Sequence, residues 1–154
     1  MTEKHASGDA CSTFFFFNRN RMVLLLILLL AFWLRVFALS QESYWFDEVH
    51  SIQKAQAGGV RAIWEALRGD VHPPFYFWLL SWWLQWFGAG EFGARFLSVL
   101  CGVGSIAALY AWGRELHLPR RACLIAIFLL AISPHAIWYS QQARMYALLV
   151  FLGV

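Results

Sequence analysis

Residues 22–50 read MVLLLILLLAFWLRVFALSQESYWFDEVH, a long apolar run that leads directly into an aromatic and acidic motif. The first part of the run, Met22 to Leu34, carries no charge. A helix that crosses the ~30 Å hydrocarbon core of a bilayer needs about 20 mostly apolar residues. We therefore predict a transmembrane helix over residues 22–39, with the acidic motif just beyond its far end.

The residues on either side of this run indicate its orientation. Arg19 and Arg21 precede it, and basic residues favour the cytoplasmic end of a span. We predict a signal-anchor helix after a cytoplasmic tail over residues 1–21, disordered away from the bilayer. A cleavable signal peptide is the alternative, but Ser40-Gln41-Glu42 offers no small-x-small cleavage site.

Composition places the whole chain among membrane proteins. Of 154 residues, 60% are hydrophobic and 14% charged, and the mean hydropathy is +0.55. Ten of the twelve basic residues are Arg, several of them beside apolar runs, which argues against a nucleic-acid surface and favours phosphate at a membrane. Cys11, Cys101 and Cys123 lack metal-like spacing and are expected to be small apolar residues.

We predict a structured external loop over residues 40–91. A short helix begins near Asp47 and is broken at Gly58-Gly59. An amphipathic helix on the membrane follows, since apolar side chains recur there at helical spacing. The apolar positions are Val60, Ile63, Trp64 and Leu67. Phe75 to Phe87 is rich in Trp but too short to span, so we predict an interfacial or re-entrant helix.

The remaining chain completes an all-α, multi-span fold. The segment 114–121 contains Arg114, Arg120 and Arg121, so it is expected in the cytoplasm. An even number of spans must then precede it, which excludes Phe75 to Phe87 as a span. Ser133-Pro134 is expected to kink or end the next helix. The predicted segments are a span over 92–113, the cytoplasmic loop, a span over 122–139, an external loop over 140–145 and the start of a further span over 146–154. Because that last run is short, we expect the chain to be the front part of a longer protein.

Two adjacent carboxylates, Asp47 and Glu48, are the first candidates for chemistry. On a helix their side chains point about 100° apart, so they can do different jobs. One can accept a proton from an acceptor hydroxyl while the other orients a sugar or a metal. Capping of the helix by Asp47 is the structural alternative, and spacing favours neither.

Basic side chains on the same predicted side of the membrane form the second set. Arg35, Arg95 and Arg144 are expected at one depth, where guanidinium groups can grip a lipid phosphate, although each could snorkel instead. His72, fixed before Pro73-Pro74, can reach a phosphate or a metal, and a solvated loop histidine is the alternative.

Five stretches in order resemble the amino-terminal part of GT-C superfamily glycosyltransferases that use polyprenyl-phosphate sugars. These include the protein O-mannosyltransferase, aminoarabinose-transferase and RgtA/B/C/D-like groups. The stretches are Arg35, Trp45-Phe46-Asp47-Glu48, Gly69-Asp70-Val71-His72-Pro73-Pro74-Phe75-Tyr76, Glu91 to Ser98, and Ser133-Pro134 through Tyr146. Some relatives have Glu-Lys where this chain has Val71-His72, so a metal site built on that glutamate is not expected here.

The resemblance implies transfer of a hexosyl or pentosyl group from a polyprenyl-phosphate donor, with inversion, to an envelope glycan, lipid or protein. It implies Asp47 as general base and Glu48 as its acidic partner. It implies Arg95 and His72 at the donor phosphate or its metal, with Arg35 and Arg144 in support. We expect an integral protein of the bacterial inner membrane whose active-site loop faces the periplasm or exterior.

Other readings stay open from the sequence. A non-catalytic truncated protein or a small interaction subunit could keep the same scaffold. A transporter is disfavoured because the charges gather outside the spans rather than within them. The cofactor is not determined, and a divalent metal remains open, as do the sugar and the acceptor.

Overall fold

The computed structural model describes residues 6–70 and 72–154, with side chains from Arg19 onward. In these residues the secondary structure is helical and contains no strand, in agreement with the predicted all-α class. The helices are α1 (Ala6–Val36), α2 (Phe46–Ala55), α3 (Gly59–Ala66), α4 (Pro74–Phe87), α5 (Glu91–Glu115), α6 (Arg120–Ile132), α7 (Pro134–Ser140) and α8 (Tyr146–Gly153).

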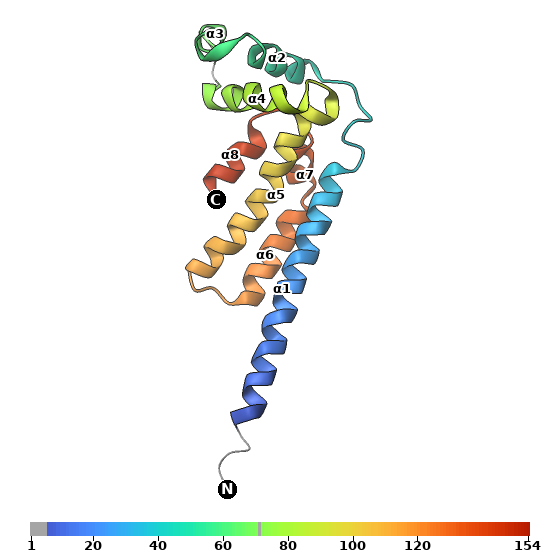
Figure 1. Cartoon of the computed structure of the whole chain (residues 1–154), viewed down its shortest axis with the longest axis vertical. Helices are drawn as coiled ribbons and strands as arrows, with labels where there is room; N and C mark the ends of the chain where they lie inside the picture. The colour runs from blue at the N-terminus through green and yellow to red at the C-terminus, as the bar shows by residue number, and fades with distance from the viewer. Residues whose placement is uncertain (1–5, 71) are drawn as a thin grey trace.

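The helices form a bundle with a cap at one end (Figure 1). Helices α1, α5 and α6 run along the long axis and pack on one another, while α7 and α8 lie against α5. Helices α2, α3 and α4 make up the cap, at the end opposite to the amino terminus. The acidic motif therefore lies where the cap meets the bundle.

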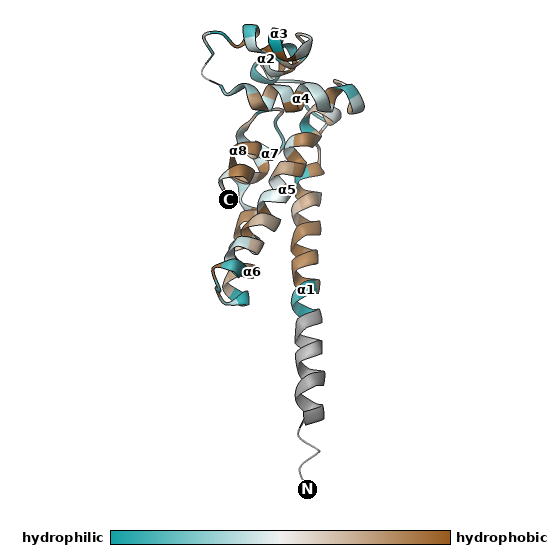
Figure 2. Ribbon diagram, turned by 60° about the vertical axis from the view of Figure 1, so that its left-hand side comes forward, coloured by the Kyte–Doolittle hydropathy of each residue, from teal (hydrophilic) through white to brown (hydrophobic). Residues whose placement is uncertain are grey.

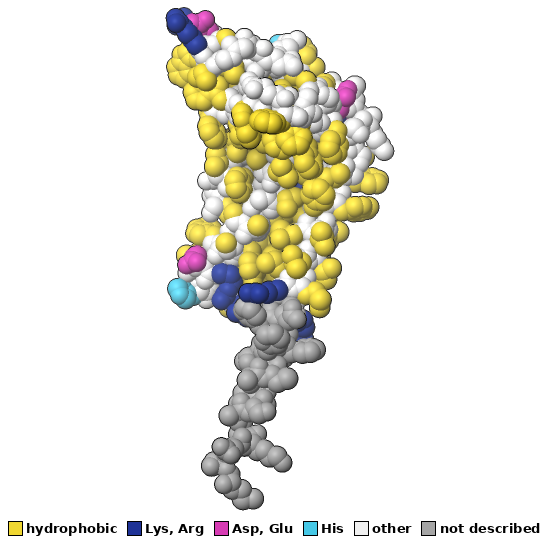
Figure 3. Space-filling view, in the orientation of Figure 1, with side chains coloured by type: hydrophobic (Ala, Val, Ile, Leu, Met, Phe, Trp, Pro, Cys, Tyr) yellow, Lys and Arg dark blue, Asp and Glu magenta, His cyan; other side chains and the backbone are white. Residues whose placement is uncertain are grey.

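Hydrophobic side chains cover the middle of the molecule. In Figure 3 the charged and histidine side chains on the visible face gather at its two ends. Figure 2 shows the described part of α1 as hydrophobic between hydrophilic ends. Leu26 and Leu29 of α1 and Leu129 of α6 are each about 60% exposed. Exposed apolar surface of this extent marks contact with a partner or with lipid, and a belt around a bundle fits lipid.

Among the described residues, α5 is the one single helix long and apolar enough to cross a membrane. It covers the span predicted over residues 92–113. Helices α6 and α7 together have the length and composition of a broken span or a re-entrant loop, bent by 60° at Ser133-Pro134, where the sequence predicted a kink or end. The described part of α1 contains Arg19, Arg21 and Arg35, and α1 is not among the candidate spans. The multi-span architecture beyond these helices remains a prediction.

Helix α1 is longer than predicted. It begins at Ala6 rather than at Met22, so the helix includes much of the segment that we expected as a disordered tail. It ends at Val36, and turns follow to Gln41. The tail prediction for residues 1–5, like the environment of the Cys11 side chain, lies outside the described residues.

The cap has its own apolar core, which continues into α5 and α8. Ile63 of α3 and Leu67, the residue after this helix, are buried in this core, whereas Val60 and Trp64 are exposed. The prediction that α3 lies with its apolar face on the membrane is thus wrong for Ile63 and Leu67, because that part of the face packs on protein. Helix α4, with Pro74 at its first turn, runs across the end of the bundle (Figure 1), and its place at the membrane interface stays a prediction.

A buried arginine supports the break between α6 and α7. Pro134 has no N–H, so the Leu130 carbonyl loses its helical donor. Arg35, with 1% of its surface exposed, donates from Nη2 to the Leu130 carbonyl at 3.4 Å and from Nη1 to the Ala131 carbonyl at 3.1 Å. A cation at the carboxyl end of a helix also complements the helix dipole. Arg35 therefore caps α6 from the neighbouring α1.

Gly102 of α5 provides the space for this cap. Arg35 Nε donates to Ser140 Oγ at 3.3 Å, and both groups lie against Gly102. A Cβ atom at position 102 would lie 2.1 Å from Ser140 Oγ and 3.1 Å from Arg35 Nε. The close approach of α5 to α7 thus requires glycine at this position.

We predict that Gly102→Ala destabilises the protein although alanine favours helices. Helix propensity alone would stabilise the variant by about 1 kcal/mol, whereas overpacking against Ser140 costs about 1–3 kcal/mol. Thermal unfolding in detergent measures the net effect, and we expect a lower midpoint than in the wild type. Gly153→Ala is the matched control, because nothing lies within 4 Å of a Cβ atom there. A higher midpoint for Gly102→Ala would contradict the packing described.

Candidate active site

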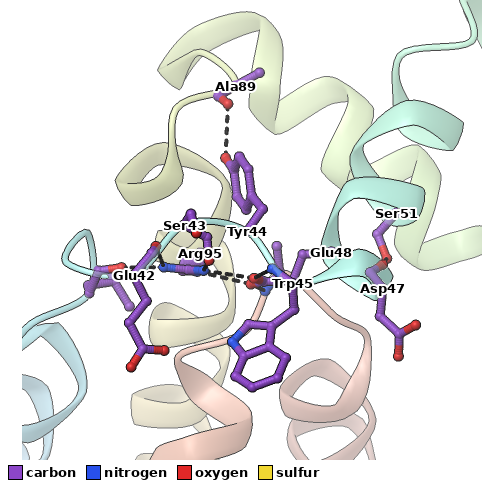
Figure 4. A network of polar contacts seen from close by, with 11 residues as sticks. Glu42, Ser43, Tyr44, Trp45, Asp47, Glu48, Ser51, Ala89 and Arg95 are labelled. Carbon is purple, nitrogen blue, oxygen red and sulfur yellow. Dashed lines mark hydrogen bonds and ion pairs between the residues drawn. The ribbon is translucent and has the colours of Figure 1, made fainter.

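The acidic motif is fixed by a buried ion pair between Glu48 of α2 and Arg95 of α5 (Figure 4). Arg95 Nε donates to Glu48 Oε1 at 2.9 Å, and Arg95 Nη2 donates to Glu48 Oε2 at 2.7 Å. Both side chains are buried, at 4% and 1% exposed. This two-pronged contact is the strong geometry between a guanidinium and a carboxylate.

The remaining donors of Arg95 hold the segment that leads from α1 into the cap. Nη1 donates to the carbonyls of Leu39 and Glu42, both at 2.8 Å, and Nη2 donates to the Ser43 carbonyl at 3.2 Å. With the two bonds to Glu48, all five N–H donors of the guanidinium are used within the protein. The expected contact of Arg95 with the donor phosphate would require one of these bonds to break.

Glu48 also accepts two backbone hydrogen bonds, from Ala143 N–H at 2.8 Å and from Trp45 N–H at 3.1 Å. In the contact with Trp45, the Glu48 side chain accepts a hydrogen bond from the backbone N–H of the N-cap residue, as in a capping box at the start of α2. Capping thus falls to Glu48, and the alternative that Asp47 caps the helix is wrong. Burial acts to raise the pKa of Glu48, but the hydrogen bonds from Arg95, Ala143 and Trp45 outweigh burial and hold that pKa below its ordinary value.

Asp47 has the opposite environment. Its carboxylate points away from the Glu48–Arg95 network in Figure 4, and 68% of its side chain is exposed. Its nearest cationic partner is Arg144, with Nη2 3.8 Å from Oδ2. At this separation the two groups attract each other without a hydrogen bond, so the Asp47 carboxylate is free to accept a proton.

Asp47 and Arg144 line one pocket of about 430 Å³, which we call the Asp47 pocket. Aromatic rings supply most of its remaining wall. Its lining residues are Trp45, Phe46, Asp47, Glu48, Trp138, Tyr139, Gln142, Arg144 and Tyr146. A small pocket with a few polar groups among aromatic walls is typical of a ligand site.

Arg144 is the predicted phosphate ligand with donors to spare. Its Nε is buried and has no hydrogen-bond partner among the described residues. Its other contacts are long: Nη1 lies 3.3 Å from the Asp47 carbonyl, and Nη2 lies 3.4 Å from the Tyr146 hydroxyl. A buried and weakly satisfied guanidinium is costly unless a ligand completes its contacts.

Arg35 and His72 lie elsewhere. Arg35 caps α6 inside the bundle and does not line the Asp47 pocket, so the expected support for a phosphate there would require Arg35 to leave these carbonyls. His72 Nδ1 lies 2.5 Å from Asp70 Oδ1, and Lys54 of α2 pairs with the same carboxylate. The hydrogen bond from Lys54 is the main reason that the pKa of Asp70 lies well below its ordinary range. His72 does not line the Asp47 pocket.

No group of three or more His, Cys, Asp and Glu side chains within the described residues is placed to hold a metal ion. Beside Asp70 and His72, the ammonium group of Lys54 occupies a position next to the carboxylate. The residues at this place therefore do not form the acidic ligand set that a divalent cation prefers.

The part of the chain that contains Arg95 and Arg144 matches a known protein family. Residues 71–152, more than half of the chain, match the model of the dolichyl-phosphate-mannose-protein mannosyltransferase family. The chain belongs to this family. No curated protein and no solved structure matches the chain.

Membership of the mannosyltransferase family agrees with the GT-C resemblance found in the sequence motifs. It makes the chain part of a family of membrane glycosyltransferases. The family match includes His72, Arg95 and Arg144 but begins after Asp47 and Glu48. Geometry alone therefore joins the acidic motif to the matched region, through the contact of Glu48 with Arg95 and Ala143.

Several residues that build the candidate site were not singled out from the sequence. The Ala143 amide and the carbonyls of Leu39 and Glu42 hold the Glu48–Arg95 pair, and backbone partners leave no trace in a motif. Trp138 and Tyr139 line the Asp47 pocket, although neither was among the candidate site residues. The signal available for them was their place in the stretch from Ser133 to Tyr146, which carries part of the GT-C resemblance.

Removal of the Arg95 side chain should lower the free energy of unfolding far more than removal of an exposed arginine. Arg95→Met leaves Glu48 charged and buried, and loss of one partner of such a pair costs about 3–5 kcal/mol. Arg95→Lys should not rescue stability, because an ammonium offers three donors in place of five. Equilibrium unfolding in detergent measures both variants.

Arg61→Met is the control, because Arg61 pairs with Glu65 on the surface of α3 with 93% of its side chain exposed. Such a pair is worth about 0.5 kcal/mol. The double variant Arg95→Met with Glu48→Gln should recover part of the lost stability, since no unpaired charge remains. Equal unfolding free energies for Arg95→Met and Arg61→Met would contradict the buried pair.

Low pH should abolish the contribution of Glu48 to the free energy of unfolding. Its pKa is lowered from the ordinary value of 4.5, so its contribution is complete above pH 4.5 and is lost as pH falls through the lower, folded-state pKa. The stability difference between wild type and Glu48→Gln, measured by unfolding at a series of pH values, should shrink below pH 4.5. A difference that grows toward acid would contradict this assignment.

Proposed function

We propose that this chain carries catalytic residues of an integral-membrane, inverting glycosyltransferase. It would transfer a hexosyl or pentosyl group from a polyprenyl-phosphate donor to a hydroxyl of an envelope glycan, lipid or protein. The family name, with its dolichyl-phosphate-mannose donor, supports this class of donor. The observation that carries the proposal is that one carboxylate of the acidic pair is free and faces an incompletely satisfied arginine in one pocket.

In the proposed step Asp47 is the general base. It takes the proton of the acceptor hydroxyl as the hydroxyl oxygen attacks the anomeric carbon of the donor sugar. A new carbon–oxygen bond forms on one face while the bond to the phosphate oxygen breaks on the other. The electron pair of that bond leaves with the phosphate, so the anomeric configuration inverts in a single displacement.

Arg144 stabilises the leaving phosphate in this scheme. Its unpartnered Nε and loosely held Nη atoms can form a planar fork on phosphate oxygens. A phosphate would replace the 3.8 Å contact with Asp47, which leaves that carboxylate to the acceptor. Arg95 and Arg35 take no part because their donors serve the protein, and His72 takes none because it does not line the pocket.

Glu48 acts through position rather than by contact with substrate. Its bonds to Arg95 and Ala143 fix the first turn of α2, from which the Asp47 side chain projects. The adjacent carboxylates thus divide the work between support and chemistry. Misplacement of a catalytic group by about 1 Å can cost about 100-fold in rate, which gives this support its importance.

The basic residues near one end of the bundle support the proposed side of the membrane. Arg114, Arg120 and Arg121 lie in and beside the turn between α5 and α6, at the end of the bundle away from the cap. With that end in the cytoplasm, the cap and the Asp47 pocket face the periplasm or exterior, in a bacterial inner membrane.

We predict that Asp47→Asn lowers transfer by about 100-fold to 10,000-fold without loss of stability, since the amide keeps the shape but cannot accept the proton. The assay follows labelled sugar from polyprenyl-phosphate mannose to acceptors in membranes that contain the protein. Arg144→Gln should also lower transfer, through the phosphate. Glu65→Gln on the exposed face of α3 is the control and should match the wild type.

Two outcomes would overturn the proposal. Equal transfer by wild type and Asp47→Asn would remove Asp47 as the base. Absence of transfer with both, in membranes where the protein is folded, would favour a non-catalytic member of the family that keeps the scaffold as an interaction subunit.

A further inference from the structure

A second pocket, of about 290 Å³, lies on the other side of the wall of the Asp47 pocket. We call it the Glu42 pocket. It is formed where the outer end of α1, the segment leading to α2 and the segment after α7 meet. Its lining residues are Ala38, Leu39, Gln41, Glu42, Trp45, Arg95, Trp138, Gln141 and Gln142. No part of the proposed transfer step uses this pocket.

Hydrogen bonds to backbone carbonyls hold the walls of the Glu42 pocket in place. Arg95 grips the backbone at Leu39 and Glu42, as described above. On the opposite wall the Gln141 side-chain amide donates to the carbonyls of Leu34, Arg35 and Phe37 at 3.3, 3.4 and 3.0 Å. A pocket whose walls are fixed in advance loses less entropy when a ligand binds.

The charge of the Glu42 pocket differs from that of the Asp47 pocket. The Glu42 carboxylate points away from Arg95 in Figure 4, and it has no hydrogen bond or ion pair within the described residues. Arg95 also faces the pocket, but Glu48 neutralises it. The pocket therefore offers an unpaired carboxylate and the Gln142 amide, which suit hydroxyl groups and repel a phosphate.

The two pockets share Trp45, Trp138 and Gln142. Both indoles are exposed, at 60% and 53%, and offer flat apolar faces beside these polar groups. A volume of 290 Å³ lies at the small end of ligand pockets, which suits one sugar ring rather than a lipid or a peptide.

We propose that the Glu42 pocket binds a neutral pyranose ring of the acceptor. The ring lies against the indoles, its hydroxyls donate to the Glu42 carboxylate, and the Gln142 amide contacts a further hydroxyl. The adjacent hydroxyl of the acceptor then reaches Asp47 past the shared wall. This inference rests on the proposed function for its orientation and selects a glycan among the acceptors left open there.

Binding of small glycosides to the purified full chain tests this site without the need for transfer. The neutral probes are the methyl pyranosides of mannose, glucose, galactose and xylose, and the anionic probe is mannose 1-phosphate. Saturation-transfer NMR and titration give the dissociation constants. We expect at least one neutral probe to bind with a constant on the order of 1 mM.

The variants separate the two pockets. Glu42→Gln should raise the dissociation constant of the neutral probe about tenfold, because a hydrogen bond to a charged group is lost. Asp47→Asn should change that constant by no more than about twofold. For mannose 1-phosphate we expect the reverse, with weakening by Arg144→Gln and none by Glu42→Gln. Glu42 is exposed, so its variant should unfold at the wild-type temperature, which serves as the folding control.

Failure of all four neutral probes to bind would overturn the inference, as would binding that Glu42→Gln leaves unchanged. Tighter binding of mannose 1-phosphate to Glu42→Gln than to wild type, with no effect of Arg144→Gln, would also overturn it by placing the donor in this pocket. If binding of a neutral probe depends on Glu42 while sugar transfer does not depend on Asp47, that result would support the sugar site in the Glu42 pocket and reject the proposed function.

Discussion

The buried pair of Glu48 and Arg95 is the interaction on which the arrangement of the cap and the bundle depends. Through it, α5 holds the start of α2, the segment from Leu39 to Ser43 and the backbone at Ala143. Burial of two charges is costly, and here every donor of Arg95 and both oxygens of Glu48 are satisfied. The pair therefore specifies a unique position for the acidic motif rather than simply adding stability.

The pair also gives the two carboxylates different chemistry. The Glu48 carboxylate is fully hydrogen-bonded within the protein. Asp47, one residue earlier on the same helix, points about 100° away and lines a pocket. Arg35 follows a similar rule at the break between α6 and α7, where a buried guanidinium satisfies carbonyls that a proline has freed. Of the three arginines once expected at a phosphate, two serve the backbone and Arg144 remains available.

The sequence predicted much of the helical framework. The break at Gly58-Gly59, the start of α4 at the proline pair and the bend at Ser133-Pro134 all follow from local backbone chemistry. The division of labour between Asp47 and Glu48 could not be predicted, because it depends on contacts with residues about 50 and 100 positions further along the chain. The unpaired Nε of Arg144 is likewise a property of packing and not of any motif.

The N–H donors of Arg95 are all used within the protein, whereas the Arg144 guanidinium can still bind the phosphate of the sugar donor. An experimental structure of Asp47→Asn with a non-hydrolysable polyprenyl-phosphate sugar analogue tests this most directly. We expect the phosphate to lie within hydrogen-bond distance of the Arg144 guanidinium and both Glu48–Arg95 bonds to stay intact. A phosphate bound to Arg95, with Glu48 released from it, would contradict the account.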